Sequence, residues 1–224
     1  MRIGIIGAGM IGSTLAKLWA EADHEILISS RHPDQLQSLV DELGPRASAG
    51  TPADAAKFGD AILLTVPLKA LPALAGEIGP LLHGKVVLDT GNAYEQRDGD
   101  IAREASRNPR GSAAWAAALF PQSKWVKAFN TVYYKTLASE AHRSSDRVGI
   151  PLASDSPQAL EVASQLVRDA GFQPVVVGDL GQGKHFEPGT PVYNTGMSAP
   201  DLQRAFAKHA PSGASRAEPP RAAP

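Results

Sequence analysis

The chain has 224 residues, a formal net charge of −1 and no cysteine. The near-neutral charge gives no general attraction to nucleic acid or to a membrane surface, and the absence of cysteine excludes disulfides, thiolate nucleophiles and cysteine-ligated metals. The six histidines are scattered along the chain, so we expect no metal site. Because we find no leader peptide and no apolar run of about 18 residues, we expect a cytoplasmic protein that does not bind membranes.

In the first half of the chain, short apolar segments alternate with segments whose apolar residues recur at helical spacing. The strand-like segments lie at 3–6, 25–29, 61–66 and 86–89, with a weaker one near Ala47. The helical segments lie at 11–19, 33–43 and 71–78, and a short one starts at Thr51, with Asp54 placed to complete a capping box. Strands that are apolar on both faces and joined by helices predict a doubly wound parallel sheet with right-handed crossovers.

The second half continues this alternation less regularly. Strands are predicted at 125–129, 147–153 and 174–178, and helices at 111–120, at 132–142 and from Ser156 to Gly171. We therefore predict an α/β fold with a doubly wound, mostly parallel sheet of about eight strands in a single domain, residues 1–210, including a small C-terminal extension. Little beyond the tail follows the last predicted strand, so we expect no large helical C-terminal domain, and the Pro- and Ala-rich composition of residues 211–224 predicts a disordered tail.

Three glycines near the N-terminus, Gly7, Gly9 and Gly12, match the pattern G-x-G-x-x-G between a predicted strand and a predicted helix. In a Rossmann-type fold the first glycine permits the tight turn, the second lets the backbone approach a diphosphate, and the third lets the helix pack closely. The alternative is a turn that serves packing alone. We expect the whole turn to bind a dinucleotide through Gly7, Ala8, Gly9, Met10, Ile11 and Gly12.

The end of the second strand indicates which dinucleotide binds. NAD sites usually have a carboxylate there, which accepts hydrogen bonds from the ribose. This strand is followed by Ser30, Arg31 and His32, with no carboxylate before Asp34. A serine hydroxyl and a guanidinium suit a 2′-phosphate, which a carboxylate would repel. We therefore predict NADP(H), with His32 as a further contact when it is protonated.

The loops after the later strands supply the remaining candidates, because ligands of such sheets bind beyond the carboxyl ends of the strands. Each of these loops has a structural alternative: Pro67 starts a helix, Asp89 caps its loop, or Asn130 caps a helix. The candidates are Thr65, Val66 and Pro67 after the fourth strand, Gly91 and Asn92 after the fifth, and Asn130 after the sixth.

Five segments, in this order, resemble the coenzyme F420-dependent NADP reductase family: GIIGAGMIGSTLA, ISSRHP, LLTVP, VVLDTGNAYEQRDG and WVKAFNT. The resemblance covers roughly residues 1–180. A domain of the same kind is fused to membrane helices in metalloreductases that pass hydride from NADPH to a flavin. Asn130 stands where deazaflavin reductases of the family tend to have His, and the segment DTGNAYEQRDGD also differs from theirs.

The resemblance implies hydride transfer between NADP(H) and a flavin-like or deazaflavin (F420) acceptor, and it implies a homodimer. It places the NADP contacts at the Gly7–Gly12 turn, at Ser30 and at Arg31, and it places Pro67 near the nicotinamide. The resemblance does not identify a catalytic residue, and Asn130 is the candidate that we name for this role. Direct hydride transfer needs geometry more than an acid or base.

Two alternatives stay open. A dehydrogenase acting on another small molecule would need a proton donor, for which Lys127 and Lys135 are candidates, although solvated lysine is the default interpretation. His185 could face the acceptor, but a surface histidine is the simpler interpretation. The other alternative is an NADPH-sensing module without catalysis. Dispersed basic residues give no support for a nucleic-acid partner.

Overall fold

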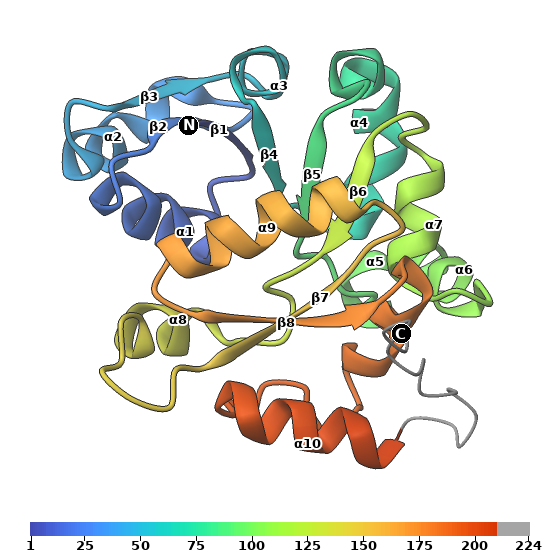
Figure 1. Cartoon of the computed structure of the whole chain (residues 1–224). Coiled ribbons are helices and arrows are strands. Elements are labelled where there is room, and N and C mark those ends of the chain that lie inside the picture. The colour runs from blue at the N-terminus through green and yellow to red at the C-terminus, as the bar shows by residue number, and fades with distance from the viewer. Residues whose placement is uncertain (210–224) are drawn as a thin grey trace, which may run out of the picture.

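A single mixed sheet organises the computed structural model, which describes residues 1–209 (Figure 1). The strand order is β3-β2-β1-β4-β5-β6-β7-β8, and every neighbouring pair is parallel except β6 and β7. The prediction of a doubly wound, mostly parallel sheet of about eight strands is therefore confirmed. The strands are β1 Arg2–Ile6, β2 Glu25–Ser29, β3 Ala47–Gly50, β4 Ala61–Leu64, β5 Val86–Asp89, β6 Lys124–Lys127, β7 Gly149–Ala153 and β8 Gln173–Gly178.

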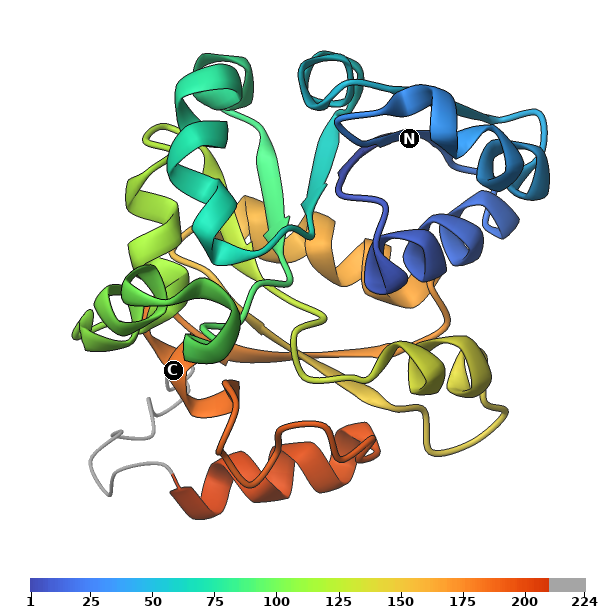
Figure 2. The same cartoon turned by 180° about the vertical axis from the view of Figure 1, so that it is seen from behind.

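Helices cover both faces of this sheet (Figures 1 and 2). One core lies between the sheet and α1, α2, α8 and α9, and a second core lies on the opposite face under α3, α4, α6 and α7. The α-helices are α1 Met10–Glu21, α2 Gln37–Leu43, α3 Pro52–Phe58, α4 Leu71–Ile78, α5 Glu95–Asp98, α6 Asp100–Arg107, α7 Ser112–Ala118, α8 Tyr134–Glu140, α9 Pro157–Asp169 and α10 Ala199–His209. The 3₁₀ helices are η1 Pro33–Leu36, η2 Leu68–Ala70, η3 Gly79–Leu82 and η4 Leu180–Phe186.

Local signals in the sequence explain where several elements begin. In β1, Ile5 points into the first core and Ile6 into the second, so an uninterrupted apolar run fits a strand buried on both faces. The predicted capping box of α3 is present: the hydroxyl of Thr51 accepts from the amide of Asp54 at 3.2 Å, and the carboxylate of Asp54 accepts from the amide of Thr51 at 3.0 Å. Ser156 caps α9 by the first of these bonds alone, because its hydroxyl accepts from the amide of Ala159 at 3.2 Å.

The segment after β8 contains elements that were not predicted. No helix was expected by name in the small C-terminal extension, whereas η4 and α10 follow β8, and α10 packs against β7 and β8. Phe186, Val192 and Leu202 form a third core with the outer strands. The stretch of α10 that has apolar residues at helical spacing is short, so its local pattern is a weak signal for a helix. These apolar residues gain packing partners only when the chain returns to the sheet. The predicted disorder of 211–224 lies outside the described residues.

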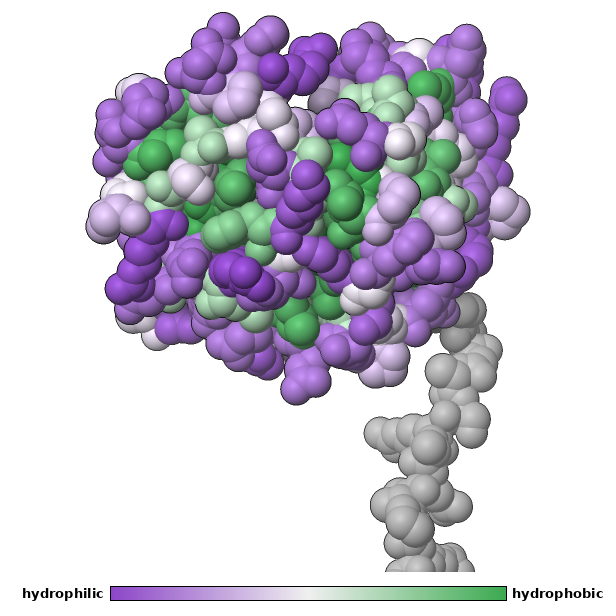
Figure 3. All heavy atoms as spheres, turned by 90° about the horizontal axis from the view of Figure 1, so that it is seen from above, coloured by the Kyte–Doolittle hydropathy of each residue, from purple (hydrophilic) through white to green (hydrophobic). Residues whose placement is uncertain are grey.

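The surface of the molecule is largely hydrophilic on the face shown in Figure 3, with apolar side chains between the polar ones. Among residues 1–209, no helix combines the length and the apolar character that crossing a bilayer requires. Within the same range, no three His, Asp or Glu side chains are grouped so that they could hold a metal ion.

Candidate functional site

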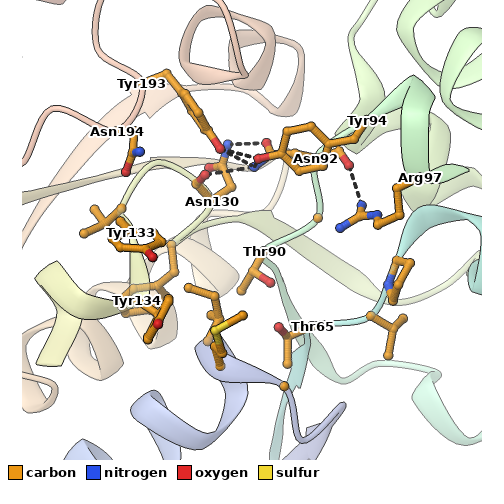
Figure 4. Close-up of a pocket in the computed structure, with 18 residues that line it drawn as sticks. Thr65, Thr90, Asn92, Tyr94, Arg97, Asn130, Tyr133, Tyr134, Tyr193 and Asn194 are labelled. Carbon is orange, nitrogen blue, oxygen red and sulfur yellow. Dashed lines mark hydrogen bonds between the residues drawn. The ribbon is translucent and has the colours of Figure 1, made fainter.

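A cleft of about 290 Å³ opens at the carboxyl ends of the central strands (Figure 4). It lies where the strand order reverses, between β1 and β4, which is the position at which open α/β sheets bind ligands. One wall, here called the glycine side, consists of Gly9, Met10, Ile11, Thr65, Val66 and Pro67. The other wall, here called the tyrosine side, consists of Asn92, Tyr94, Arg97, Phe129, Asn130, Val132, Tyr133, Tyr134, Tyr193 and Asn194. Thr90 and Gly91 lie between the two walls along the chain and complete the lining.

The glycine turn has two glycines that the fold itself requires and one that it does not. Gly7 has φ of +113°, and a Cβ there would meet the carbonyl of Thr65. A Cβ on Gly12 would meet the carbonyl of Gly7. A Cβ on Gly9, in contrast, would have no atom within 4 Å and would point into open space. Packing therefore accounts for Gly7 and Gly12 but not for Gly9, which leaves the approach of a ligand as the reason for a glycine there.

The helix that follows this turn has the electrostatics of an anion site. Gly9 is the N-cap of α1, it makes no side-chain cap hydrogen bond, and the first turn of the helix contains no acidic residue. The amides of the first turn have no partner inside a helix, and the helix dipole places positive potential at this end. These residues fit the diphosphate of a dinucleotide, because free amides and positive potential converge beside an open backbone.

Ser30 and Arg31 lie beside this turn but outside the lining of the cleft. Ser29 pairs with Ile6 in the sheet, and the amide of Gly7 donates to the carbonyl of Ser29 at 3.3 Å, so the ends of β1 and β2 are adjacent. The hydroxyl of Ser30 accepts from the amide of His32 at 2.9 Å, which leaves its own proton free to donate. Arg31 is exposed and forms no ion pair within residues 1–209.

All four tyrosines of the chain line this one cleft. Tyr94 follows β5, Tyr133 and Tyr134 follow β6, and Tyr193 comes from the segment between η4 and α10. The rings of Tyr133 and Tyr134 contact each other edge to face, with centroids 4.6 Å apart. Tyrosine provides a flat apolar face and a polar tip, so a wall of four suits a flat, partly polar ligand.

Two asparagines join the loops that carry the tyrosines. The side-chain amide of Asn92 donates to the carbonyl of Asn130 at 2.9 Å, and the side-chain amide of Asn130 donates to Asn92 Oδ1 at 3.0 Å. Asn130 also donates to the carbonyl of Phe186 at 2.9 Å, so it connects the end of β6 to η4. Within the described residues Asn130 Oδ1 is buried without a hydrogen-bond partner. Such an orphaned acceptor beside a cleft is a reason to look for a ligand or water there.

The hydroxyls of Tyr94 and Tyr193 point toward one another and are hydrogen-bonded, as Figure 4 shows. The side-chain amide of Asn92 lies 3.5 Å from each of these oxygens. Burial, followed by the hydrogen bond to Tyr94, raises the pKa of Tyr193, so its hydroxyl stays protonated in neutral solution. We call these two groups the hydroxyl pair.

Arg97 contacts the ring of Tyr94 and so helps to hold the hydroxyl pair in place. Its guanidinium lies over the ring of Tyr94, 4.9 Å from the centroid, and donates to the carbonyl of Asn92 at 2.9 Å. It also pairs with the buried carboxylate of Asp98 at 2.8 Å. Burial acts to raise the pKa of Asp98, but hydrogen bonds from Arg97 and from the amide of Lys69 outweigh it, so this pKa is lowered.

Lys127 departs from the expectation of a solvated lysine, because it is completely buried at the end of β6. Its ammonium lies 3.3 Å from Asp89 Oδ2 and donates to the carbonyl of Gly91. Asp89 in turn accepts from the amide of Gly91 at 2.7 Å, so it does cap its loop. The pair holds the turn between the two walls of the cleft. Lys127 has no place among the lining residues, and Lys135 is exposed.

The structure brings together nine of the predicted site residues and leaves six outside the lining. Those in the lining are Gly9, Met10, Ile11, Thr65, Val66, Pro67, Gly91, Asn92 and Asn130. Gly7, Ala8 and Gly12 belong to the turn itself, whereas Ser30, Arg31 and His32 lie past β2. His185 is exposed in η4 and does not line the cleft.

The four tyrosines and Arg97 were not among the predicted site residues. Tyr94, Tyr133 and Tyr134 follow the ends of strands, so their position in the post-strand loops was a signal that could have found them. Tyr193 lies past the last strand, and no local pattern places it in the cleft.

A doubly wound sheet with a glycine turn at its switch point and a cleft above that turn defines the protein as a member of the dinucleotide-binding class of α/β proteins. Comparison with known families identifies it further. The model of the family described as NADP oxidoreductase, coenzyme F420-dependent, matches residues 2–93. The F420-dependent NADP reductase of Methanothermobacter thermautotrophicus is 31% identical over 206 residues, which cover 86% of this chain and 87% of that protein. The chain therefore belongs to the F420-dependent NADP oxidoreductase family and is an NADP-dependent oxidoreductase.

Two further comparisons place the chain among related proteins. Metalloreductase STEAP3 of Rattus norvegicus is 24% identical over 186 residues, and the chain spans only 36% of its length. The crystal structure of the hypothetical protein SMa0349 from Sinorhizobium meliloti superposes with a TM-score of 0.72 at 28% identity, covering 86% of this chain and 92% of that one. The match to STEAP3 therefore covers 83% of this chain but about a third of that protein, whereas the Sinorhizobium protein matches over nearly its whole length.

Proposed function

We propose that the protein binds NADPH across the glycine turn, with the diphosphate over Gly9 and the N-terminus of α1. Ser30 and Arg31 then hold the 2′-phosphate, with His32 beside them, and the nicotinamide enters the cleft between the glycine side and Asn92. The observation that carries this proposal is the open space at Gly9, since the neighbouring glycines are explained by packing and this one is not. Two observations support it: Arg31 forms no ion pair with any residue of the described range 1–209, and the first turn of α1 contains no acidic residue.

The hydride acceptor, in this proposal, is a flat conjugated ring of the flavin or deazaflavin (F420) type, bound on the tyrosine side. Four tyrosines line the cleft and provide faces for stacking, and Tyr94 and Tyr193 lie across it from Thr65. The methanogen relative is named for F420 and the rat relative for metal reduction. A ring acceptor is the chemistry that the tyrosines favour.

The chain's own contribution is to position two rings and to exclude water. When NADPH is bound, it supplies a hydride from the nicotinamide ring to the acceptor. Thr65 to Pro67 and the turn held by Lys127 and Asp89 form the rigid floor and wall against which the nicotinamide would lie. Orientation of this kind is worth several orders of magnitude in rate, and no residue of the cleft is needed as an acid or base for the hydride itself.

Replacing Arg31 by Asp tests the cofactor half of the proposal. The change puts a negative charge where the 2′-phosphate would bind, so we expect NADPH affinity to fall about 100-fold while NADH affinity changes less than about threefold. Titration calorimetry with both nucleotides measures this difference. Glu161, an exposed residue of α9, provides a matched control: Glu161→Lys changes the surface charge without affecting either affinity. Equal losses for NADPH and NADH would remove Arg31 from the site.

A panel of acceptors tests the other half. The purified chain is mixed with NADPH and, in turn, with a deazaflavin, riboflavin, a soluble quinone and a ferric chelate, and the absorbance of the reduced nicotinamide is followed. We expect turnover with the ring acceptors and much slower turnover with the chelate alone. Tight binding of NADPH without turnover on any acceptor would contradict the proposed reaction and favour a cofactor-sensing protein.

A further inference from the structure

One of the two hydroxyl protons of the hydroxyl pair has no hydrogen-bond acceptor among the described residues. Tyr94 and Tyr193 offer two hydroxyl protons, and the hydrogen bond between them consumes one. The side-chain amide of Asn92 has one N–H left after its bond to the carbonyl of Asn130, and its nitrogen lies 3.5 Å from each hydroxyl oxygen, so it is a donor to the pair and not an acceptor. Among residues 1–209, no acceptor other than the partner tyrosine is within hydrogen-bond reach of either hydroxyl. One hydroxyl can therefore donate outward.

The pair is held in place from both sides. Tyr94 is fixed by the guanidinium of Arg97 over its ring, and Arg97 is anchored by Asp98. The segment carrying Tyr193 is tied to the end of β6, because the amide of Asn194 donates to the carbonyl of Thr131 at 2.8 Å. Tyr193 is half-buried and Tyr94 is exposed, and both line the cleft. A donor held in this way needs little reorganisation when a ligand arrives.

We propose that the Tyr94–Tyr193 hydroxyl pair donates a hydrogen bond to a carbonyl oxygen on the ring of the hydride acceptor, and so selects conjugated rings that carry such an oxygen. This inference rests on the proposed function and specifies its acceptor. The reduction takes a hydride from NADPH, leaving NADP⁺, and one proton from water. The tyrosines keep their protons and supply a hydrogen bond that strengthens as negative charge develops on the ring oxygen.

Equilibrium binding tests the pair without relying on turnover. Riboflavin and its 5-deaza analogue, whose rings carry carbonyl oxygens, are titrated into the full chain with saturating NADP⁺, and flavin fluorescence is recorded. N-methylphenazinium, a flat tricyclic cation without a ring oxygen, is the matched probe. For Tyr193→Phe and for Tyr94→Phe, we expect about 3- to 10-fold weaker binding of both flavins and unchanged binding of the phenazinium.

The double variant separates a pair from two independent contacts. Because the two hydroxyls act as a unit, Tyr94→Phe/Tyr193→Phe is expected to weaken riboflavin binding no more than about twofold beyond the worse single variant. With riboflavin as acceptor, kcat is expected to fall at least about tenfold in Tyr193→Phe, more than binding does, because hydrogen bonds to charged oxygens are the stronger ones. With the phenazinium, kcat is expected to stay within about twofold.

Several results would overturn this assignment. Unchanged flavin affinity in Tyr193→Phe, equal losses for riboflavin and the phenazinium, or no binding of either flavin to the wild type would each do so. The thermal unfolding midpoints of the variants are measured alongside. If Tyr94→Phe has a much lower midpoint than the wild type, the flavin affinity of Tyr193→Phe alone tests the proposal. Titration of NADP⁺ by itself keeps the two proposals distinct. Failure of the wild type to bind NADP⁺ contradicts the proposed function, whereas normal NADP⁺ binding with unaltered flavin affinity contradicts only the role of the pair.

Discussion

The glycine side of the cleft is shaped by backbone, whereas the tyrosine side is shaped by side chains. On the glycine side, Gly7 and Gly12 allow main-chain atoms to approach main-chain atoms, and the groups left free are amides at the start of α1. On the tyrosine side, hydroxyls, amides and a guanidinium from three separate loops hold one another. The family model ends at residue 93, one position before Tyr94. The difference teaches that the glycine side lies within the part of the chain that the family model describes, whereas the side chains to which we assign the acceptor lie mostly beyond it.

The largest expected effect on the free energy of unfolding concerns the buried Lys127–Asp89 pair. Lys127→Met leaves the charge of Asp89 buried without its partner, so we expect the free energy of unfolding to fall by about 3–5 kcal/mol. Urea denaturation followed by tryptophan fluorescence measures it, since Trp125 lies beside Asp89. Adding Asp89→Asn to this variant removes the stranded charge and is expected to restore part of the loss. A drop below about 1 kcal/mol for the single change would mean that the pair does not support the Gly91 turn.

A smaller effect is expected on the glycine side. Gly12→Ala drives a methyl group into the carbonyl of Gly7, so we expect a loss of about 1–3 kcal/mol in unfolding free energy together with weaker NADPH binding. Gly9→Ala is the matched control, because its methyl group meets no protein atom. We expect Gly9→Ala to keep the stability of the wild type while NADPH affinity falls about tenfold. If Gly9→Ala bound NADPH normally, the diphosphate would not pass over this residue.

The smallest expected effect is the pH dependence of the stability contributed by the Arg97–Asp98 ion pair, which holds Arg97 over the ring of Tyr94. The folded protein lowers the pKa of Asp98 below its ordinary value of 3.8, so its contribution to stability is present above that value and is lost as the pH falls through the lowered pKa. Asp98→Asn is therefore expected to be about 1 kcal/mol less stable than the wild type at neutral pH, since Arg97 is part exposed and its charge is screened. The stabilities of the two proteins should converge as the pH falls through the lowered pKa of Asp98. A constant difference across the pH range would contradict an electrostatic role.

Predictions from the sequence succeeded where local chemistry decides the structure. The capping box at Thr51, the cap at Ser156 and the glycine turn depend on neighbours a few residues away, so the linear order of residues contains the information. Apolar runs such as Ala61–Leu64 predicted strands buried on both faces, and their alternation with helices predicted the parallel sheet.

Three features were not predicted from the sequence: helix α10, the burial of Lys127 and the position of Tyr193 in the cleft. Lys127 was expected in solvent because lysine usually is, and only the sheet register, which places it against Asp89 of the neighbouring strand, makes its burial possible. Tyr193 reaches Tyr94 across 99 positions of the sequence. Contacts of this range depend on how the chain returns to the sheet after β8, which no short pattern contains.

The amino-acid sequence by itself determined the strand–helix alternation and the glycine turn, because each depends on residues adjacent along the chain. It also showed that Ser30 and Arg31, and no carboxylate, follow the second strand. Only the tertiary structure decided that the four tyrosines share one cleft and that a hydroxyl pair faces it. The physical reason is that backbone geometry is specified locally, whereas the contacts between side chains of distant loops exist only after the sheet has closed the distance between them.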